Sequence, residues 1–505
     1  QTCALPILSQ ELTNEADAYS DMNGADEAKK RRPSRATQVK SDITKLFLEQ
    51  HFQNVFKEST ECKLRHRQFK EKLQQSDISK KEKKTLESQF AKGESNIKRI
   101  KRRNLRADQF EKIKLIGRGA FGDVYVVRDK EDGQIYAMKI LKKTELIKKG
   151  QIINTLAERD FLTQANNPWS VQLYYSFIDS KNLYLVMEYL NGGDLMNLLI
   201  KRGILTETET RFFIAETLLA IDCVHKTGFI HRDIKPDNLL LTSDGHIRLT
   251  DFGLSTKLDR YSDPLVQLVD ELTDVMQEKD AILSNEPYVR AKKRRDQVCS
   301  TVGTPDYIAP EVLLKQPYTI SVDFWSLGAI MYEMLFGSPP FLSDTNRGTA
   351  LRIIRWNETL TFPSVPPVSD DAIDLISKLL CSSDERLDFE GIKNHRFFEG
   401  IDWDNIIHSK SPCIPNVKSK EDTSNFDDFD EQEVNDSDNS DNNNDDEEIA
   451  NVAFMGFQFN KKAINIQPRD IEIDNIKATP KKKKSDKEKH KLGKDSKKSK
   501  KRNIN

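Results

Sequence analysis

The chain of 505 residues lacks the marks of a secreted or membrane-spanning protein. Its six cysteines are scattered and include no C-x-x-C pair, so a disulfide framework is not indicated. No apolar run approaches the ~20 residues that cross a bilayer. The chain does not begin with Met, and the apolar stretch at residues 4–8 is too short, and lacks the basic flank, for a secretory signal. We therefore expect a reduced, soluble, intracellular protein, cytoplasmic with the nucleus as a second compartment.

Charge is nearly balanced, at −1 overall, but it is unevenly distributed along the chain. Residues 98–106 and 481–502 are basic, whereas residues 421–448 are dominated by Asp, Glu and Asn. Blocks of this kind repel themselves and bury little apolar area, so we expect the last two to be disordered. Nucleic-acid binding by residues 481–502 would rest on charge alone, and we do not expect it.

The most informative stretch is HRDIKPDN at residues 231–238, followed by DFG from Asp251. Phosphoryl transfer needs a carboxylate that orients the attacking hydroxyl and a cation that neutralises the moving phosphate. Asp233 and Lys235 supply these two groups. Asn238 and Asp251 supply oxygen atoms, which suit a hard cation such as Mg²⁺. The order of these residues predicts Mg²⁺-dependent phosphoryl transfer.

A glycine-rich segment upstream matches a loop that covers nucleotide phosphates. Its residues are Ile116, Gly117, Arg118, Gly119, Ala120, Phe121, Gly122, Asp123 and Val124. The G-x-G-x-x-G spacing is weak by itself, because dinucleotide-binding domains share it. The apolar runs at 110–116 and 124–127 indicate two strands, which favours a hairpin over phosphates. Lys139, on the next apolar run, is expected to face the phosphates and to pair with Glu158 on a helical stretch.

Together these motifs resemble the eukaryotic protein kinases over residues 110–398. The resemblance implies an α+β, bilobal fold with a small antiparallel N-lobe and a mainly helical C-lobe. It also implies ATP and Mg²⁺ as cofactors and transfer of the ATP γ-phosphate to Ser or Thr of protein substrates. The catalytic residues implied are Asp233, Lys235, Lys139 and Glu158.

The same resemblance assigns the hinge between the lobes. Met187 would be the gatekeeper, and the backbone of Glu188 and Tyr189 would meet the adenine edge. Asp194 would accept from ribose hydroxyls or from a basic substrate residue. Asp194, Asp237 and Glu333 resemble acidic residues that recognise arginine before the phosphoacceptor, although three solvated acids remain the alternative. We favour basic substrates.

Residues 399–465 resemble the C-terminal extension of AGC kinases, with an acidic linker inside it. The resemblance implies that Phe426 approaches the adenine. It also implies that Phe454, Phe457 and Phe459 form a hydrophobic motif that docks on the N-lobe. Gln458 stands where the NDR/LATS branch carries a phosphorylatable Thr. We therefore expect weak, constitutive docking, with a degenerate and unused motif as the alternative.

Residues 37–106 follow a helical period and read as a helical pair with a break near residues 76–77. The apolar positions include Ile43, Val55, Phe56, Leu64 and Phe69, and the exposed face is expected to be basic, with Arg65 and Arg67 on it. A merely solvated helical segment is the alternative. In this region too, the chain resembles the NDR/LATS branch of AGC kinases. The resemblance implies a Mob-family coactivator that binds these helices.

The segment 251–311 is long for a kinase activation segment and carries an apolar helical stripe from Leu265 to Met276. We interpret the stripe as an inhibitory helix that disfavours the active position of Glu158. Ser300 is the expected regulatory phosphorylation site, whose phosphate would pair with Arg232.

Two further pairings follow from the family: an ion pair between Glu311 and Arg386, and backbone hydrogen bonds from the catalytic loop to Asp323. The sequence thus predicts a serine/threonine kinase in NDR/LATS-like morphogenesis or cell-cycle signalling. The alternative is a catalytically weak scaffold that binds a Mob-like coactivator. The expected division is residues 1–36, a disordered or artefactual N-terminus; 37–106, the helical region; 110–398, the kinase domain; 399–465, the extension; and 466–505, a disordered Lys-rich tail.

Overall fold

The structure is a computed structural model that describes residues 33–75, 78–101, 104–119, 122–165, 167–258, 264, 266–274, 305–429 and 451–462. The chain divides into two compact units, which are described separately. One contains residues 53–103, and the other contains residues 104–461 together with the chain up to residue 52. No helix in the described ranges is long and apolar enough to cross a membrane.

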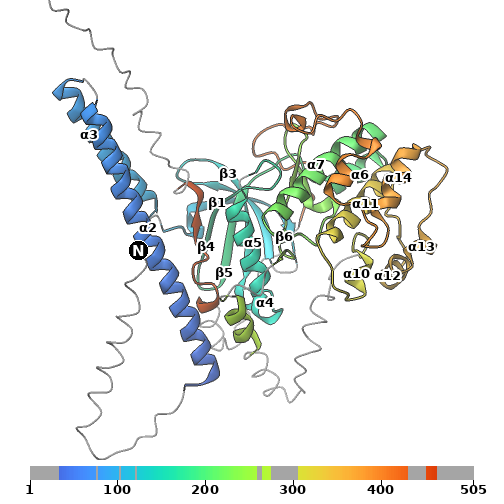
Figure 1. The fold of residues 1–505 in the computed structure, drawn as a ribbon, viewed down its shortest axis with the longest axis horizontal. Helices are drawn as coiled ribbons and strands as arrows, with labels where there is room; N and C mark the ends of the chain where they lie inside the picture. Colours follow the sequence, from blue (N-terminus) through green and yellow to red (C-terminus); the bar gives the residue numbers. More distant parts are fainter. Residues whose placement is uncertain are drawn as a thin grey trace, which may run out of the picture. The chain divides into compact units, whose positions relative to one another are not determined.

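The N-terminal helical pair is confirmed as α2 (Arg35–Gln75) and α3 (Lys80–Lys101) (Figure 1). Phe69 of α2 and Phe90 of α3 stack with their ring centroids 4.1 Å apart, and Leu73 packs beside them. These three buried side chains form the small core of the helical unit.

Two side-chain placements differ from the sequence expectation. Val55, Phe56 and Leu64 belong to the apolar pattern, yet their exposed fractions are 46%, 70% and 48%. Arg65 was expected on the exposed basic face, and this is wrong. Its Nε lies 2.8 Å from Oε1 of the buried Glu94 on α3, because the facing helix offers a carboxylate that needs a partner.

The N-lobe is a sheet whose order is β1-β2-β3-β5-β4-β10, with every neighbouring pair antiparallel. Its strands are β1 (Phe110–Arg118), β2 (Gly122–Asp129), β3 (Ile135–Lys142), β4 (Leu173–Ile178), β5 (Asn182–Glu188) and β10 (Phe459–Asn460). Two helices accompany them: α4 (Lys143–Lys148) and α5 (Ile152–Gln164). The sixth strand comes from the C-terminal extension, which the sequence did not predict.

The C-lobe is mainly helical, as Figure 1 shows. Its helices are α6 (Leu195–Arg202), α7 (Glu207–Lys226), α10 (Pro310–Leu313), α11 (Ser321–Phe336), α12 (Asn346–Ile354), α13 (Trp356–Thr359), α14 (Asp370–Leu379) and α15 (Phe389–Lys393). Two small two-stranded antiparallel sheets pair β6 (Phe229–Ile230) with β9 (Thr256–Lys257), and β7 (Leu239–Leu241) with β8 (Ile247–Leu249).

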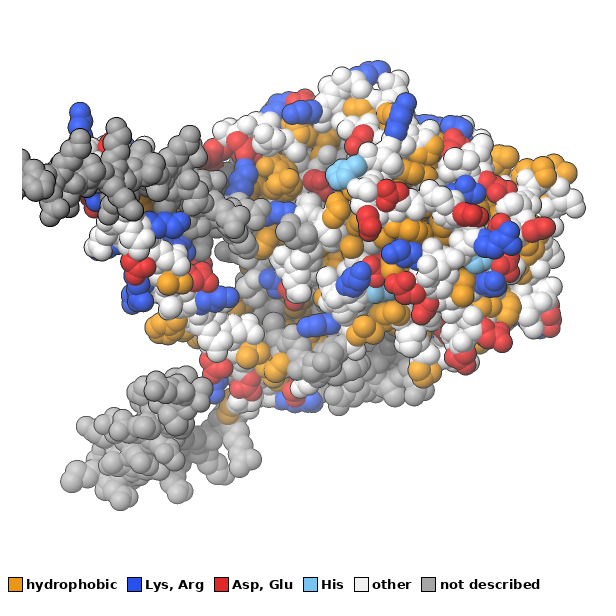
Figure 2. Space-filling view, turned by 45° about the horizontal axis from the view of Figure 1, so that its top comes forward, with side chains coloured by type: hydrophobic (Ala, Val, Ile, Leu, Met, Phe, Trp, Pro, Cys, Tyr) orange, Lys and Arg blue, Asp and Glu red, His pale blue; other side chains and the backbone are white. Residues whose placement is uncertain are grey.

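Close packing of α11 against α14 fixes the C-lobe core. A Cβ added at Gly328 of α11 would lie 2.7 Å from Leu379 Cβ, so only glycine permits this approach. Trp325 and Phe341 stack in the same core, with centroids 5.7 Å apart. The expected bilobal α+β kinase fold is confirmed. On the face drawn in Figure 2, acidic and basic side chains are interspersed, in keeping with the nearly balanced charge.

Candidate active site

The loop after β6 is held by one buried carboxylate, Asp323 of α11. Its Oδ2 accepts from His231 N at 3.0 Å, and its Oδ1 accepts from Arg232 N at 2.8 Å. His225 Nε2 lies 2.8 Å from Oδ2. Burial opposes the charge of Asp323, but the hydrogen bond from His225 and the facing backbone lower its pKa. The expected backbone bonds to Asp323 are confirmed, and they support a positive φ of 66° at Arg232.

Asp233, Lys235 and Asn238 are brought together by this loop and the short turn after it. Asn238 Nδ2 donates to Asp233 Oδ2 at 3.0 Å and to the Asp233 carbonyl at 2.8 Å. Lys235 Nζ lies 3.1 Å from the same Oδ2. Burial opposes the charge of Lys235, yet the Asp233 carboxylate raises its pKa above the ordinary value, so Lys235 is a cation at neutral pH.

Lys139 of β3 bridges two carboxylates. Its Nζ lies 2.8 Å from Glu158 Oε1, on α5, and 2.9 Å from Asp251 Oδ1. The positive charge of Lys139 lowers the pKa of Asp251 to about 2, so Asp251 is ionised. Burial opposes the Lys139 charge, but the two carboxylates raise its pKa.

The long insert contributes a helix to the main core. Residues 266–274 are helical, and Val269 and Leu272 are fully buried in the main core. The expected apolar stripe is therefore confirmed for these two positions, while Leu265 and residues 275–276 lie outside the described residues. Glu158 pairs with Lys139 in this structure, and the inhibitory role expected for the insert helix stays a prediction.

The glycine-rich segment forms the turn between β1 and β2. Ile116, Gly117, Arg118 and Gly119 lie at the end of β1 or just after it, and Gly122, Asp123 and Val124 begin β2. Gly119 N donates to Gly122 O at 2.8 Å, and Arg118 Nε lies 3.2 Å from Asp123 Oδ1. Ala120 and Phe121 lie outside the described residues.

The hinge joins β5 to α6. Met187 is buried at the end of β5, and the carboxylate of Glu188 accepts from Gln172 N at 3.0 Å. Asp194 is the N-cap of α6, where Oδ1 accepts from Asn197 N at 2.7 Å. Burial raises the pKa of Asp194, and the capping bonds partly offset this effect.

The C-terminal extension crosses this hinge through backbone oxygens. Tyr189 Oη donates to Asp422 O at 2.6 Å, and Asn425 Nδ2 donates to Asn191 O at 3.0 Å. The rings of Tyr189 and Phe426 lie 5.9 Å apart. Lys114 of β1 forms an ion pair with Asp428 of the extension, in which Nζ lies 2.6 Å from Oδ1. Of the residues in this extension, the sequence predicted only Phe426 beside the adenine site, because backbone acceptors leave no mark on side-chain identity.

A buried acidic group lies in the C-lobe. Glu333 of α11 accepts from Tyr307 Oη at 2.6 Å. Burial raises the pKa of Glu333 to about 7, with smaller contributions from Asp306 and Asp237. Asp306 is 7% exposed, and its Oδ1 has no hydrogen-bond partner among the described residues. Only Glu333 and Asp237 of this group were singled out from the sequence.

The hydrophobic motif is docked on the N-lobe. Phe454 and Phe457 are fully buried, and Phe459 begins β10, where it pairs with Ser176 of β4. Arg159 of α5 donates from Nη1 to Gly456 O at 2.8 Å. Gln458 is exposed, and the regulatory residue expected at Ser300 lies outside the described residues.

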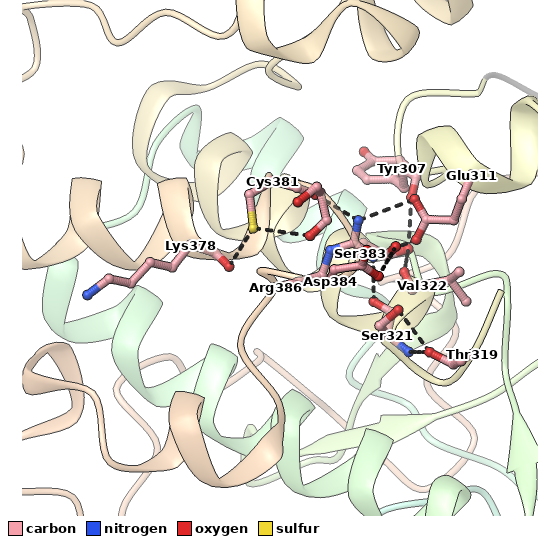
Figure 3. Close-up of polar contacts among 12 residues, drawn as sticks. Tyr307, Glu311, Thr319, Ser321, Val322, Lys378, Cys381, Ser383, Asp384 and Arg386 are labelled. Carbon is pink, nitrogen blue, oxygen red and sulfur yellow. Dashed lines mark hydrogen bonds and ion pairs between the residues drawn. The ribbon is translucent and has the colours of Figure 1, made fainter.

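The expected ion pair between Glu311 and Arg386 is confirmed (Figure 3). The two guanidinium nitrogens contact the two carboxylate oxygens at 2.6 and 3.3 Å. The same nitrogens donate to Ser321 O and Cys381 O, both at 2.9 Å. Because both side chains are buried, the pair braces the segment after Tyr307 from inside the C-lobe.

Comparison with known proteins agrees with this geometry. The family model described as "Protein kinase domain" matches residues 110–398, and that described as "Protein kinase C terminal domain" matches residues 417–459. The chain is 43% identical to the serine/threonine-protein kinase tricornered of Drosophila melanogaster, over 79% of this chain and 89% of the relative. It is 44% identical to CBK1 of Pneumocystis carinii, over 78% and 81% of the two chains. It is also 44% identical to sax-1 of Caenorhabditis elegans, over 78% and 84%. With its kinase lobes and its AGC-type C-terminal domain, the chain belongs to the NDR family of serine/threonine protein kinases.

Proposed function

We propose that Asp233 orients the hydroxyl of a substrate serine or threonine and accepts its proton, while Lys235 neutralises the phosphoryl group during transfer. One observation carries this assignment. Asn238 Nδ2 and Lys235 Nζ both contact Oδ2 of Asp233, which leaves Oδ1 for the substrate hydroxyl. Fixing one oxygen of a carboxylate while the other faces the substrate is the geometry that a general base needs.

ATP is the phosphate donor that this fold accommodates, with its phosphates under the β1–β2 turn and its adenine at the hinge. Lys139, held by Glu158, would face the phosphates, and its raised pKa keeps it cationic for that purpose. The adenine would meet the backbone of Glu188 and Tyr189 beside Met187. Phe426, next to the Tyr189 ring, would close this side of the nucleotide site.

The residues present fit Mg²⁺. Asn238 uses its amide nitrogen on Asp233, so its Oδ1 remains a ligand, and Asp251 is ionised because its pKa is about 2. Both atoms are hard oxygen donors of the kind that Mg²⁺ selects. Bound Mg²⁺ would neutralise charge on the phosphate oxygens.

We propose that the protein substrates carry basic residues near the phosphoacceptor. Glu333 and Asp306 are buried, and one oxygen of Asp306 has no partner among the described residues. A buried acceptor without a donor is costly, and an arginine side chain would supply donors in a fixed fork. Asp194 accepts from Asn197 on both carboxylate oxygens, whereas Glu333 accepts from Tyr307 on Oε2, and this difference favours Glu333 as the main contact.

A Mob-family coactivator is the proposed partner of α2. Val55, Phe56 and Leu64 expose apolar surface, and Lys63 and Arg67 are exposed beside them in the sequence. Such a surface suits a partner with an apolar groove and an acidic rim. Replacing both Lys63 and Arg67 by Glu should slow the association of a purified Mob-family protein and make the association rate less dependent on salt concentration. Replacing Lys410, another exposed lysine, by Glu should change neither quantity. Equal capture by both variants would place the interface elsewhere.

The test of the catalytic assignment is phosphate transfer from ATP to a basic peptide. Asp233→Asn preserves the shape of the side chain but removes the base, so kcat should fall by about 10²-fold or more. The scaffold alternative predicts little transfer by the parent chain and no further loss in the variant. Physiologically, we propose a role in morphogenesis or cell-cycle signalling, and membership of the NDR family supports the morphogenetic role. We propose the cytoplasm and the nucleus as its compartments.

A further inference from the structure

The helical pair brings together three side chains that have no part in phosphoryl transfer. Cys62 and His66 lie one helical turn apart on α2, and Glu94 faces them from α3. Their ligand atoms all lie within 4.8 Å of one another. Cys62 Sγ is 3.7 Å from His66 Nδ1 and 3.4 Å from Glu94 Oε2.

These separations match a tetrahedral metal centre. Zinc bonds of about 2.3 Å to sulfur and about 2.1 Å to nitrogen or oxygen, at the tetrahedral angle, place the sulfur about 3.6 Å from a nitrogen or oxygen ligand. Both separations that involve Cys62 Sγ fall within about 0.2 Å of that value. We propose that Cys62, His66 and Glu94 form a binding site for a single Zn²⁺ ion that fastens α2 to α3.

The surroundings of the site fit this role. Glu94 is 4% exposed, and its Oε1 accepts from Arg65 Nε at 2.8 Å, so this oxygen is already oriented while Oε2 faces the sulfur. A ligating carboxylate that is itself hydrogen-bonded is the usual arrangement around protein-bound metals. Without the ion, Arg65 Nη2 also donates to Oε2, at 3.2 Å, so the guanidinium contacts both oxygens of the Glu94 carboxylate. The metal would take over that second contact.

The proton balance is simple. The Cys62 thiol now donates to Glu94 Oε2 at 3.4 Å, and this proton leaves to solvent as the zinc–sulfur bond forms. His66 Nδ1 lies 2.9 Å from the Cys62 carbonyl, so its proton moves to Nε2 before Nδ1 binds the ion. His66 is exposed, so solvent can carry that proton and fill the fourth coordination position.

Cobalt substitution tests the site in the full-length chain. The protein is stripped with a chelator and titrated with Co²⁺, whose bonds to thiolate give charge-transfer absorption that carboxylate sites do not give. This distinction matters because residues 421–448 are rich in Asp and Glu. We expect one equivalent of thiolate-bound Co²⁺, displaced by Zn²⁺, and slower amide exchange in α2 and α3 with Zn²⁺ bound.

Matched variants decide the result. Cys62→Ser and His66→Gln should each abolish the thiolate absorption or weaken binding at least tenfold, with helix content checked by circular dichroism. Cys223→Ser on α7 and His51→Gln, an exposed residue of α2, should leave it unchanged. Absence of thiolate absorption in the parent chain, or its persistence in Cys62→Ser, would overturn the proposal.

Discussion

Replacing Phe457 by Ala is the sharpest test of how the hydrophobic motif acts. The Phe457 ring is fully buried, and Arg159 of α5 lies over it, with its guanidinium carbon 5.7 Å from the ring centroid. Truncating a buried Phe to Ala removes about 3–5 kcal/mol. The docking equilibrium of residues 451–460 should therefore shift by about 10²-fold or more, since each 1.4 kcal/mol is tenfold.

The other contacts of the motif are already made in the parent chain, so they do not offset this loss. They include the buried Phe454, the two residue pairs of β10 with β4 and the bond from Arg159 to Gly456 O. A typical hydrogen bond adds a net 0.5–1.5 kcal/mol or so. Glu158 is next to Arg159 on α5. When the hydrophobic motif docks less tightly, α5 should therefore be less firmly positioned, and the Lys139–Glu158 ion pair should form a smaller fraction of the time. We expect kcat to fall about tenfold.

Two measurements check this reasoning. Hydrogen exchange should show faster exchange at Asn460 and along β4, and steady-state kinetics should show the lower kcat. Gln458→Ala is the matched control, because Gln458 is exposed and its truncation should change stability by less than ~0.5 kcal/mol. Gln458 cannot be phosphorylated, so the parent chain should reach its activity without an upstream kinase acting at this position. Full activity and unchanged exchange in Phe457→Ala would show that docking is not required.

Three other outcomes are expected. Arg386→Met leaves the buried Glu311 without its partner and should lower the free energy of unfolding by about 3–5 kcal/mol, as measured by urea denaturation. Because burial raises the pKa of Glu333 to about 7, the side chain loses its charge as pH falls, so KM for an arginine-containing peptide should rise between about pH 8 and about pH 6. Glu333→Gln, or a peptide without arginine, should remove this pH dependence, and its persistence would refute the assignment. In the structure, Arg232 donates to Leu254 O and to Tyr318 Oη. A phosphate on Ser300 would give Arg232 an anionic partner, so Ser300→Ala should reduce the activity of phosphorylated preparations severalfold. Unchanged activity would count against the pairing of Arg232 with that phosphate.

The catalytic residues were predictable because the chemistry restricts the residue types that can serve. Phosphoryl transfer requires a carboxylate, a cation and oxygen ligands in a fixed order, and those side chains leave a readable pattern. The structure brings Lys235 and Asn238 within hydrogen-bonding distance of the Asp233 carboxylate, as that pattern indicates. Helix periodicity likewise predicted α2, α3 and the burial of Val269 and Leu272.

The features that the sequence could not provide are contacts between distant segments. The bond from Tyr189 to the Asp422 carbonyl joins residues 233 positions apart and uses a backbone acceptor that any residue would supply. Strand β10 is two residues long, too short for an alternating pattern to show. The Arg65–Glu94 pair depends on how α3 is aligned against α2, which spacing within either helix does not determine.

The position of α5 is maintained by several segments that contact one another. At the start of α2, Arg35 Nη2 lies 3.0 Å from Oε1 of Glu271, on the insert helix. Further along α2, the Phe47 ring packs against Gly456, and a Cβ added at Gly456 would lie 3.0 Å from that ring. The Gly456 carbonyl accepts a hydrogen bond from Arg159 of α5. The insert, α2 and the hydrophobic motif therefore form one continuous set of contacts that ends on the helix carrying Glu158. Residues that share such a set do not contribute additively, so removing the insert contacts through Leu272→Ser should cost more activity in Phe457→Ala than in the parent chain. Strictly additive losses would mean that the insert and the motif hold α5 independently.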